Sequence, residues 1–327
     1  MTIELSVVAE SWPIEGGFTI SRGSRTHADV VVVTLREGTR IGRGECVPYP
    51  RYGETVSGVI SDIEKMAKEF AHGLDRAGLQ LAMPAGAARN ALDCALWDFE
   101  AKRAGKSVSA LLGRAEPSPL VTAFTISVGS PEKMASDAEK AKTRPLLKVK
   151  LAGDSDPERI AAVRSAAPKA RLIVDANEAW TAETFEKNLA ACADAKVELI
   201  EQPLPAGDDM LLARIKRTVP VCADESAHTS AGLGDLRERY DAVNVKLDKT
   251  GGLTEALVMV DEAKALGFKV MVGCMLGTSL AMAPAAIAAQ GADFVDLDAP
   301  LLLSSDRIPG LSFEGSTLLP PSRELWG

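Results

Sequence analysis

The sequence predicts an α/β fold: a modified TIM barrel of the (β/α)7β type that follows an N-terminal α+β capping domain. Three observations favour this fold. From about residue 121 onward, apolar runs of strand length alternate with amphipathic, alanine-rich stretches of helical period. Several of these runs end in a charged residue, and the carboxyl ends of its strands are where such a barrel carries its chemistry. The first ~118 residues instead place strand-like runs before helices, as α+β layers do.

The N-terminal segment begins with the strand-like runs ELSVVAESW, DVVVVTLREG and IGRGECVP. The later stretch GAARNALDCALWDFEAKRAG repeats apolar residues at helical spacing and predicts a packing helix. Two prolines in RAEPSPL (114–120) indicate a linker. We therefore expect a capping domain over residues 1–118, a catalytic barrel over 119–300, and a tail over 301–327 that packs back on the capping domain.

The barrel is expected to contain eight strands separated by seven helices, so that its last helix is missing. Stretches such as PEKMASDAEKAK and GGLTEALVMVDEAKALG have the amphipathic pattern of the outer helices. The tail after Asp298 contains proline and glycine and has no clear helical period. The predicted strands are 121–127, 146–151, 171–176, 197–202, 221–226, 242–247, 269–274 and 292–298.

Length and composition exclude several classes of protein. A chain of 327 residues suits a barrel with a modest second domain. No stretch approaches 18 consecutive apolar residues, so we expect no membrane span. The start, MTIELSVVAESWPIE, lacks the pattern of a signal peptide. Five scattered cysteines without a C-x-x-C pair argue against a disulfide framework and favour a cytoplasmic protein. A net charge of −8 without a basic run argues against nucleic acid as a partner.

Three carboxylates end successive predicted strands: Asp175 in RLIVDAN, Glu201 in ELIEQP and Asp224 in VCADES. A single buried acid is usually paired or structural. Three at neighbouring strand ends repel one another unless a cation lies between them. Ligands that are all oxygen favour Mg²⁺, with Mn²⁺ as a substitute, over zinc. The pattern therefore predicts a magnesium site at the barrel mouth.

Lysines flank this predicted site. Lys148 and Lys150 lie two apart in LLKVKL, so they point to one face of a strand. Side by side inside the barrel, their charges would lower the pKa of one lysine toward neutrality, although two solvated lysines at a strand end are the simpler reading. Lys246 ends the sixth predicted strand, across the barrel from Lys150. One lysine could then remove a proton from a carbon and the other return one to the opposite face, which inverts that carbon; a single lysine would suit a Schiff base.

The last predicted strand carries Asp296 and Asp298 on a single face, in DFVDLDAP. Two acids at a barrel mouth that do not bind the metal could hold an ammonium group. They could equally be surface acids in a loop.

These motifs together resemble the enolase superfamily, in the subgroup related to muconate lactonising enzyme, and within it the L-Ala-D/L-Glu epimerases, which are dipeptide epimerases. The resemblance extends over nearly the whole chain, and the motifs occur in order at barrel spacing. They are GECVPYPRYGE, AGAARNALDCALWD, LLKVKL, IVDANEAW, EQPLP, ADES, NVKLDKTGGLTEAL, GCML and the DLD of the eighth strand.

The resemblance implies a role for each matched residue. Lys150 would be a catalytic base, Lys148 would tune it, and Lys246 would be the opposing acid or base. The Mg²⁺ ligands would be Asp175, Glu201 and Asp224. Asp296 and Asp298 would bind the α-ammonium of a dipeptide. An arginine of the loop SRGSRT, Arg25 or Arg22 with Arg25 preferred, would bind the glutamate side chain, and PYPRYGE (48–54) would be a second mobile loop that excludes water.

The leading hypothesis is Mg²⁺-dependent epimerisation of the glutamate in L-Ala-D/L-Glu, a dipeptide released from murein. Other dipeptides, o-succinylbenzoate synthesis and muconate cycloisomerisation are alternatives, but the last two substrates carry no ammonium group for Asp296 and Asp298. A class I aldolase would leave the three carboxylates unexplained, and a non-catalytic ligand-binding barrel would leave the lysines unexplained. The expected partner is a small dipeptide, with a homo-oligomer possible.

Overall fold

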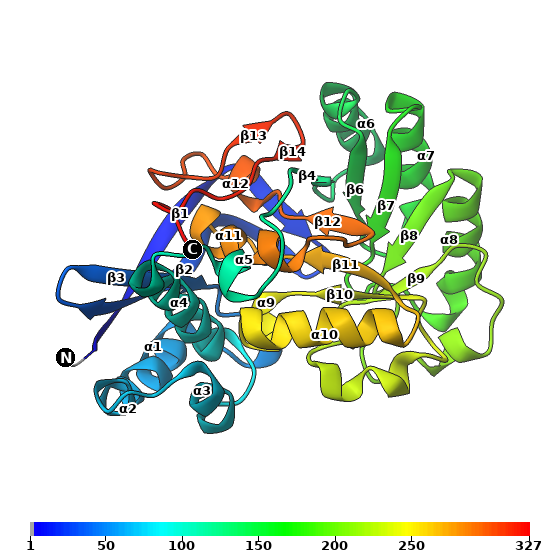
Figure 1. Ribbon diagram of the computed structural model, residues 1–327. Coiled ribbons are helices and arrows are strands. Elements are labelled where there is room, and N and C mark those ends of the chain that lie inside the picture. Colours follow the sequence, from blue (N-terminus) through cyan, green and yellow to red (C-terminus); the bar gives the residue numbers. More distant parts are fainter. Residues whose placement is uncertain (1–2) are drawn as a thin grey trace.

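A barrel and a smaller capping domain make up the protein, which we describe from a computed structural model that covers residues 3–327. Figure 1 shows the barrel strands on one side and, on the other, the N-terminal sheet with its helices. No helix among the described residues is long and apolar enough to cross a membrane.

The capping domain begins with a three-stranded antiparallel sheet of β1 (Glu4–Ile20), β2 (Gly23–Glu37) and β3 (Arg40–Cys46). One long helix, α4, lies against β3 at close range because β3 carries glycine there. A Cβ on Gly44 would lie 2.1 Å from the carbonyl oxygen of Ala91, and one on Gly42 would lie 2.4 Å from that of Ala95. The helices of this domain are α1 (Val56–Lys65), α2 (Ala67–Ala71), α3 (Arg76–Ala82), α4 (Ala87–Ala104) and α5 (Val108–Leu111), with the 3₁₀ turn η1 (Pro50–Tyr52) before them.

The barrel is a sheet of eight parallel strands whose order in space follows their order in the chain. The first and last strands are joined by a hydrogen bond from the Ala123 amide to the Val295 carbonyl, at 2.8 Å. Eight buried side chains, one from each strand or the residue beside it, fill one layer of the interior, so the barrel is a packed core. The strands are β5 (Phe124–Ile126), β6 (Leu146–Lys150), β7 (Arg171–Asp175), β8 (Val197–Glu201), β9 (Val221–Ala223), β10 (Ala242–Val245), β11 (Lys269–Gly273) and β12 (Phe294–Asp296).

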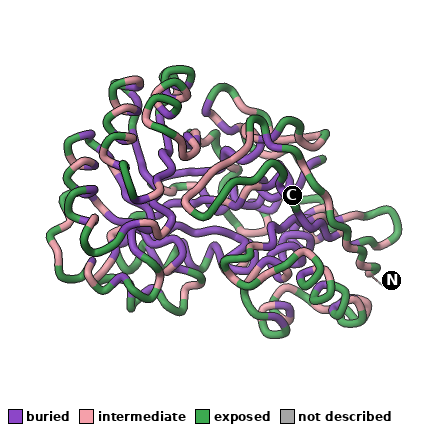
Figure 2. The backbone as a smooth tube through the Cα atoms, turned by 180° about the vertical axis from the view of Figure 1, so that it is seen from behind, coloured by how far each residue is buried: buried purple, intermediate pink, exposed green. Residues whose placement is uncertain are grey.

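Helices cover the outside of the barrel, and Figure 2 shows their exposed faces around the buried strands. The expectation of a helix after every strand is wrong at two places. Only the 3₁₀ turns η2 (Met210–Ala213), η3 (Ser230–Gly232) and η4 (Gly234–Leu236) follow β8 and β9. These connections contain several prolines and glycines, which do not continue a helix. The barrel helices are α6 (Pro131–Ala141), α7 (Asp156–Ala166), α8 (Ala182–Asp194), α9 (Leu247–Thr250), α10 (Leu253–Ala265) and α11 (Ser279–Ala288).

The C-terminal tail contacts both parts of the molecule. It contains α12 (Ala299–Leu302) and the short strands β13 (Phe313–Glu314) and β14 (Thr317–Leu318), of which β14 pairs with β4 (Leu120–Val121). At its end, the indole nitrogen of Trp326 donates to the Cys94 carbonyl at 2.9 Å, and the Gly327 amide donates to Asp98 at 2.7 Å. These contacts place the end of the tail on α4, and the domain boundaries at residues 118 and 300 stay a prediction.

Helix α4 also joins the capping domain to the barrel. The Arg89 guanidinium donates to the Thr250 carbonyl at 2.6 Å and to the Gly251 carbonyl at 3.1 Å. The Asn90 amide donates to Asp248 Oδ1 at 2.8 Å, and the Val47 amide donates to the same oxygen at 2.9 Å. These hydrogen bonds join the start of α4 and the residue after β3 to the segment that follows barrel strand β10.

Candidate active site

The carboxyl ends of the barrel strands bring six charged side chains together, all of them buried. Parallel pairing sets Lys150 of β6 beside Asp175 of β7, and Asp175 beside Glu201 of β8. The others are Lys148, Asp224 and Lys246. The sequence therefore located this cluster, because charged residues that follow buried parallel strands meet at one edge of the sheet.

Each carboxylate is paired with a lysine. Lys148 Nζ lies 2.6 Å from Glu201 Oε2 and 3.2 Å from Asp175 Oδ2. Lys150 Nζ lies 2.6 Å from Asp175 Oδ2, and Lys246 Nζ lies 2.7 Å from Asp224 Oδ2. Positive and negative charges thus alternate around the floor of the site.

These pairs correct one expectation. Burial lowers the pKa of Lys148, but the carboxylates of Asp296, Glu201 and Asp175 outweigh it and raise that pKa well above its ordinary value. The pKa of Lys246 is raised in the same way, chiefly by Asp224 against the effect of burial. Repulsion between the two neighbouring lysines therefore does not lower the pKa of Lys148, because its ammonium has carboxylate partners that the sequence alone does not reveal.

The three strand-end carboxylates differ in the direction in which their pKa is shifted. Burial opposes ionisation of Asp175 and Asp224, yet the adjacent lysines hold the pKa of both well below the usual range. Burial and the nearby charge of Asp175 instead raise the pKa of Glu201 to about 7. Among the three acids, Glu201 is thus the one whose ionised form burial and a neighbouring carboxylate most disfavour.

The donor set fits a hard divalent cation. Within residues 3–327, no three His, Cys, Asp or Glu side chains converge closely enough to ligate one ion, since the lysine ammonium groups lie between the carboxylates. Glu201 Oε2 is nevertheless buried without a hydrogen bond, and its ion contact with Lys148 does not have hydrogen-bond geometry. Three buried carboxylates from adjacent strands, one of them incompletely satisfied, are the ligands that Mg²⁺ prefers.

A fourth lysine, Lys249, belongs to this cluster and was not predicted. It lies on α9 and is buried, and its Nζ contacts Asp224 Oδ1 at 2.6 Å and the Asn244 carbonyl at 2.9 Å. The side chain of Asn244 donates in turn to Glu201 Oε1 at 2.7 Å. Lys249 and Asn244 therefore fix the orientation of two of the three carboxylates. The sequence feature that could have indicated Lys249 is its position three residues after Lys246. The two side chains lie on one face only if a helical turn follows the strand.

Asp296 and Asp298 both line the cavity above the cluster. Asp296 Oδ2 lies 2.7 Å from Lys148 Nζ, while its Oδ1 is buried and has no hydrogen-bond partner. Asp298 Oδ2 accepts a hydrogen bond from the Thr125 amide at 2.7 Å. Burial and the charge of Asp296 raise the pKa of Asp298 to about 7. The pair thus offers an unsatisfied acceptor to a ligand.

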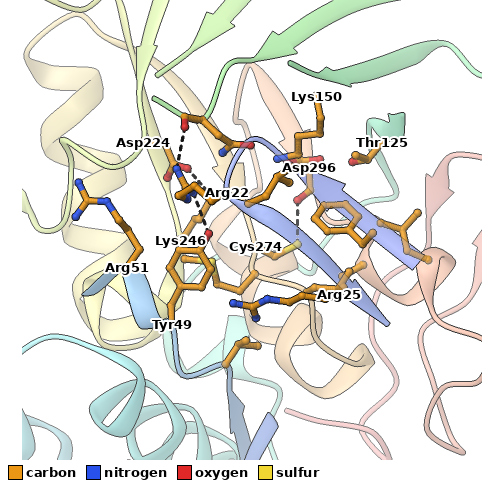
Figure 3. A pocket seen from close by; sticks show the side chains of 18 of the residues that line it. Arg22, Arg25, Tyr49, Arg51, Thr125, Lys150, Asp224, Lys246, Cys274 and Asp296 are labelled. Carbon is orange, nitrogen blue, oxygen red and sulfur yellow. Dashed lines mark hydrogen bonds and ion pairs between the residues drawn. The ribbon is translucent and has the colours of Figure 1, made fainter. Parts of the chain in front are cut away.

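The cavity has a volume of about 400 Å³ and lies between the barrel mouth and two segments of the capping domain. Figure 3 shows Arg22, Arg25, Tyr49 and Arg51 of the capping domain together with Lys150, Asp224, Lys246 and Asp296 of the barrel, and all of them line the cavity. The predicted arginine loop is the tight turn between β1 and β2, with Arg25 already on β2. Residues 48–54, the predicted second loop, contain η1 and supply Tyr49, Arg51 and Tyr52.

The two candidate arginines differ in their surroundings. Arg22 is engaged: it lies 2.8 Å from Glu225 Oε1 and donates to the Tyr49 hydroxyl at 2.9 Å and to the Asn177 carbonyl at 3.0 Å. Arg25 lines the cavity with its guanidinium carbon 5.6 Å from the centre of the Tyr49 ring. Its planar group can pair with a carboxylate in two parallel hydrogen bonds.

Known proteins resemble this chain over both domains. A family model described as the mandelate racemase/muconate lactonizing enzyme N-terminal domain matches residues 2–113, and one described as enolase C-terminal domain-like matches residues 132–310. The chain is 48% identical over 312 residues to an L-Ala-D/L-Glu epimerase of Escherichia coli (strain K12), which covers 94% of this chain and 97% of that protein. It is 41% identical over 300 residues to an N-acetyl-D-glutamate racemase of a Pseudoalteromonas species, covering 91% of this chain and 95% of that protein.

A solved structure agrees with the whole architecture. It is an enolase family member from Agrobacterium tumefaciens, described as having homology to dipeptide epimerases and as containing bound sodium and L-Ala-L-Glu. The two chains superpose with a TM-score of 0.98 at 57% sequence identity, covering 99% of this chain and 100% of that one.

Proposed function

Because the chain belongs to the mandelate racemase/muconate lactonizing enzyme family of the enolase superfamily, we propose that it epimerises the glutamate residue of L-Ala-D/L-Glu dipeptides. Family membership confirms the resemblance read from the motifs, and the relatives named as epimerases and racemases identify the chain as an isomerase. The named activities of its relatives, an L-Ala-D/L-Glu epimerase and an N-acetyl-D-glutamate racemase, support glutamate as the residue that is inverted.

The observation that carries the proposal is the position of two lysines on one cavity. Lys150 ends β6 and Lys246 follows β10, strands four places apart in a barrel of eight, and both side chains line the cavity. A substrate carbon between them would present one face to each lysine. Lys150 would remove or return the α-proton at one face, and Lys246 would do so at the other. Inversion of that carbon is the outcome.

Lys148 has a supporting role in this scheme. Its ammonium lies among Glu201, Asp296 and Asp175, so it stays positively charged while the other lysines exchange protons. A fixed positive charge beside Lys150 can hold a substrate carboxylate.

The cofactor of the proposed reaction is Mg²⁺, or Mn²⁺ in its place, held by Asp175, Glu201 and Asp224. Bound there, the ion would neutralise the negative charge that develops when a proton leaves the carbon next to a carboxylate. Lys249 and Asn244 keep two of these carboxylates oriented before the ion arrives. The Agrobacterium tumefaciens structure is described as containing bound sodium, and a dipeptide epimerase structure from Cytophaga hutchinsonii is described as a complex with Mg; both support a cation as cofactor.

The two ends of the dipeptide have separate binding groups. The unsatisfied Oδ1 of Asp296, with Asp298 beside it, would accept the α-ammonium. Arg25 would pair with the glutamate side chain. Dipeptides of this composition arise from murein, and we assign the reaction to the recycling of murein peptides.

A second candidate is racemisation of N-acylated glutamate. The relative named N-acetyl-D-glutamate racemase favours this candidate. Its named substrate has an N-acetyl group in place of an ammonium, so it needs no carboxylate partner for an ammonium in the cavity. A raised pKa at Asp298 also reduces the negative charge available to an ammonium at neutral pH.

The test is conversion of L-Ala-L-Glu and of N-acetyl-L-glutamate, measured separately by chiral chromatography with Mg²⁺ present. Inversion of the dipeptide at the higher kcat/KM supports the proposal, and inversion of N-acetylglutamate alone would replace it.

A further inference from the structure

Glu178 is the side chain on which three separate segments meet at the barrel mouth. Arg51 donates to its two carboxylate oxygens, with Nε to Oε2 and Nη2 to Oε1 each at 2.8 Å. Arg22 adds a contact to Oε2 at 3.3 Å, and the Ala206 amide donates to Oε1 at 2.8 Å. The carboxylate therefore ties the β1–β2 turn and η1 of the capping domain to the loop that follows β8.

The backbone that presents Glu178 has an uncommon conformation. Asn177 and Glu178 are consecutive non-glycine residues with φ of 45° and 67°. Such residues persist only where the surroundings hold them. Here the Asn177 amide donates to Asp175 Oδ1 at 2.9 Å, and the Glu178 amide donates to the Gln202 carbonyl at 2.8 Å. The strand-end turn is thus built to direct Glu178 toward the capping domain.

The segments that Glu178 holds also form the roof of the cavity. Arg22, Arg51, Tyr49 and Tyr52 line it, whereas Glu178 does not. Figure 3 shows Arg22 and Arg51 reaching the barrel from the capping-domain side. Further contacts exist, among them Arg22 with Glu225, Ser21 and Arg22 with the Asn177 carbonyl, and the Tyr52 ring edge-on to His228 at 4.7 Å, but each of these joins only one of the two segments to the barrel. Glu178 is the group that contacts both.

We propose that Glu178 is a positioning residue that clasps both segments of the capping domain over the barrel mouth and so sets Arg25 above the bound substrate. Arg25 lies three residues beyond Arg22, on the strand that leaves the clasped turn, so release of the turn displaces it. Glu178 does not touch the substrate. Its catalytic consequence rests on the proposed function, whereas the clasp itself is a property of the free protein.

The test is amide hydrogen exchange of the free protein over residues 20–25 and 49–54, in Glu178→Gln and in Arg51→Gln. Arg51→Gln removes the same two hydrogen bonds from the capping-domain side and leaves the barrel residues unchanged. The matched control is Glu198→Gln. The Glu198 carboxylate also accepts two hydrogen bonds from one arginine, from Arg171 Nε at 2.9 Å and from Arg171 Nη2 at 2.7 Å. This pair lies at the amino end of the barrel strands. We expect exchange in both segments to rise about five-fold or more in the first two variants and to stay unchanged in the control.

The second readout is the division between KM and kcat for L-Ala-L-Glu. Loss of the clasp should raise KM about five-fold or more with little change in kcat, because the lysines are untouched. Unchanged exchange in both Glu178→Gln and Arg51→Gln would overturn the clasp, whatever the activity. A lower kcat at constant KM would overturn the positioning role. Since exchange needs no substrate, failure of the proposed reaction would be recognised separately, by a wild-type protein that does not turn over the dipeptide.

Discussion

The ammonium nitrogen of Lys150 lies 2.6 Å from Asp175 Oδ2 on the neighbouring strand. Lys246 and Asp224 repeat this arrangement at 2.7 Å across the barrel. In both pairs a proposed proton carrier contacts a proposed metal ligand. A cation bound to Asp224 would weaken the attraction that raises the pKa of Lys246, so metal binding and the formation of a neutral Lys246 are linked.

Replacement of either lysine should abolish inversion. Lys150→Ala and Lys246→Ala each remove the group that serves one face of the α-carbon, and general acid–base groups contribute roughly 10²–10⁴-fold. We expect kcat/KM for L-Ala-L-Glu epimerisation to fall at least ~100-fold in each variant. Lys169→Ala, at an exposed lysine remote from the cavity, is the control. Full activity in either active-site variant would exclude two-base chemistry.

Replacement of Asp298 separates the two candidate functions. In Asp298→Asn the side-chain oxygen can still accept from the Thr125 amide, but the negative charge is lost. A hydrogen bond to a charged group contributes about 1.5–3 kcal/mol, so kcat/KM for L-Ala-L-Glu should fall ~10- to 100-fold. Turnover of N-acetyl-L-glutamate should be unaffected. Equal losses for both substrates would indicate that Asp298 does not recognise the ammonium group.

Arg25 and Arg22 should differ in whether their replacement distinguishes a glutamate from a glutamine dipeptide. Arg25→Ala should reduce kcat/KM for L-Ala-L-Glu by ~10-fold or more and leave L-Ala-L-Gln nearly unchanged, because only the former carries a side-chain carboxylate. Arg22→Ala should affect both dipeptides similarly, because Arg22 contacts Glu225, Tyr49 and Asn177. The comparison of the two dipeptides in each variant measures this. A selective effect of Arg22→Ala would reverse the assignment.

The sequence was sufficient for features that depend on local pattern. The strand runs and the charges at their ends located the barrel, the lysines and carboxylates at its mouth, and the acids Asp296 and Asp298, because parallel strands end at a common edge. It was not sufficient where distant segments meet. The partners of Lys148 come from three other strands, so its raised pKa could not be predicted from Lys150 alone. Lys249 depends on a short helix after β10, and Arg22 is occupied by residues far along the chain.

Stability should depend on pH through Asp248, where the capping domain meets the barrel. Burial raises the pKa of Asp248 to about 7, even though the Val47 amide and Asn90 donate to it. A carboxyl whose pKa is higher in the folded state stabilises that state below its ordinary pKa and loses this contribution as pH rises through about 7.

Asp248→Asn keeps both hydrogen bonds to Oδ1 and removes the titration. We expect the free energy of unfolding of the variant to exceed that of the wild type by up to ~4 kcal/mol at pH 8. This difference should shrink toward pH 4. Urea unfolding at several pH values measures this difference. A difference that does not vary with pH would show that Asp248 does not titrate in this range.

The most direct measurement is proton NMR of L-Ala-L-Glu in D₂O with the protein and Mg²⁺. The proposed two-base reaction predicts loss of the glutamate α-proton signal together with the appearance of L-Ala-D-Glu, and EDTA should stop both. Retention of the α-proton signal at full intensity in the presence of Mg²⁺ would contradict the assignment of Lys150 and Lys246 as proton carriers for this dipeptide.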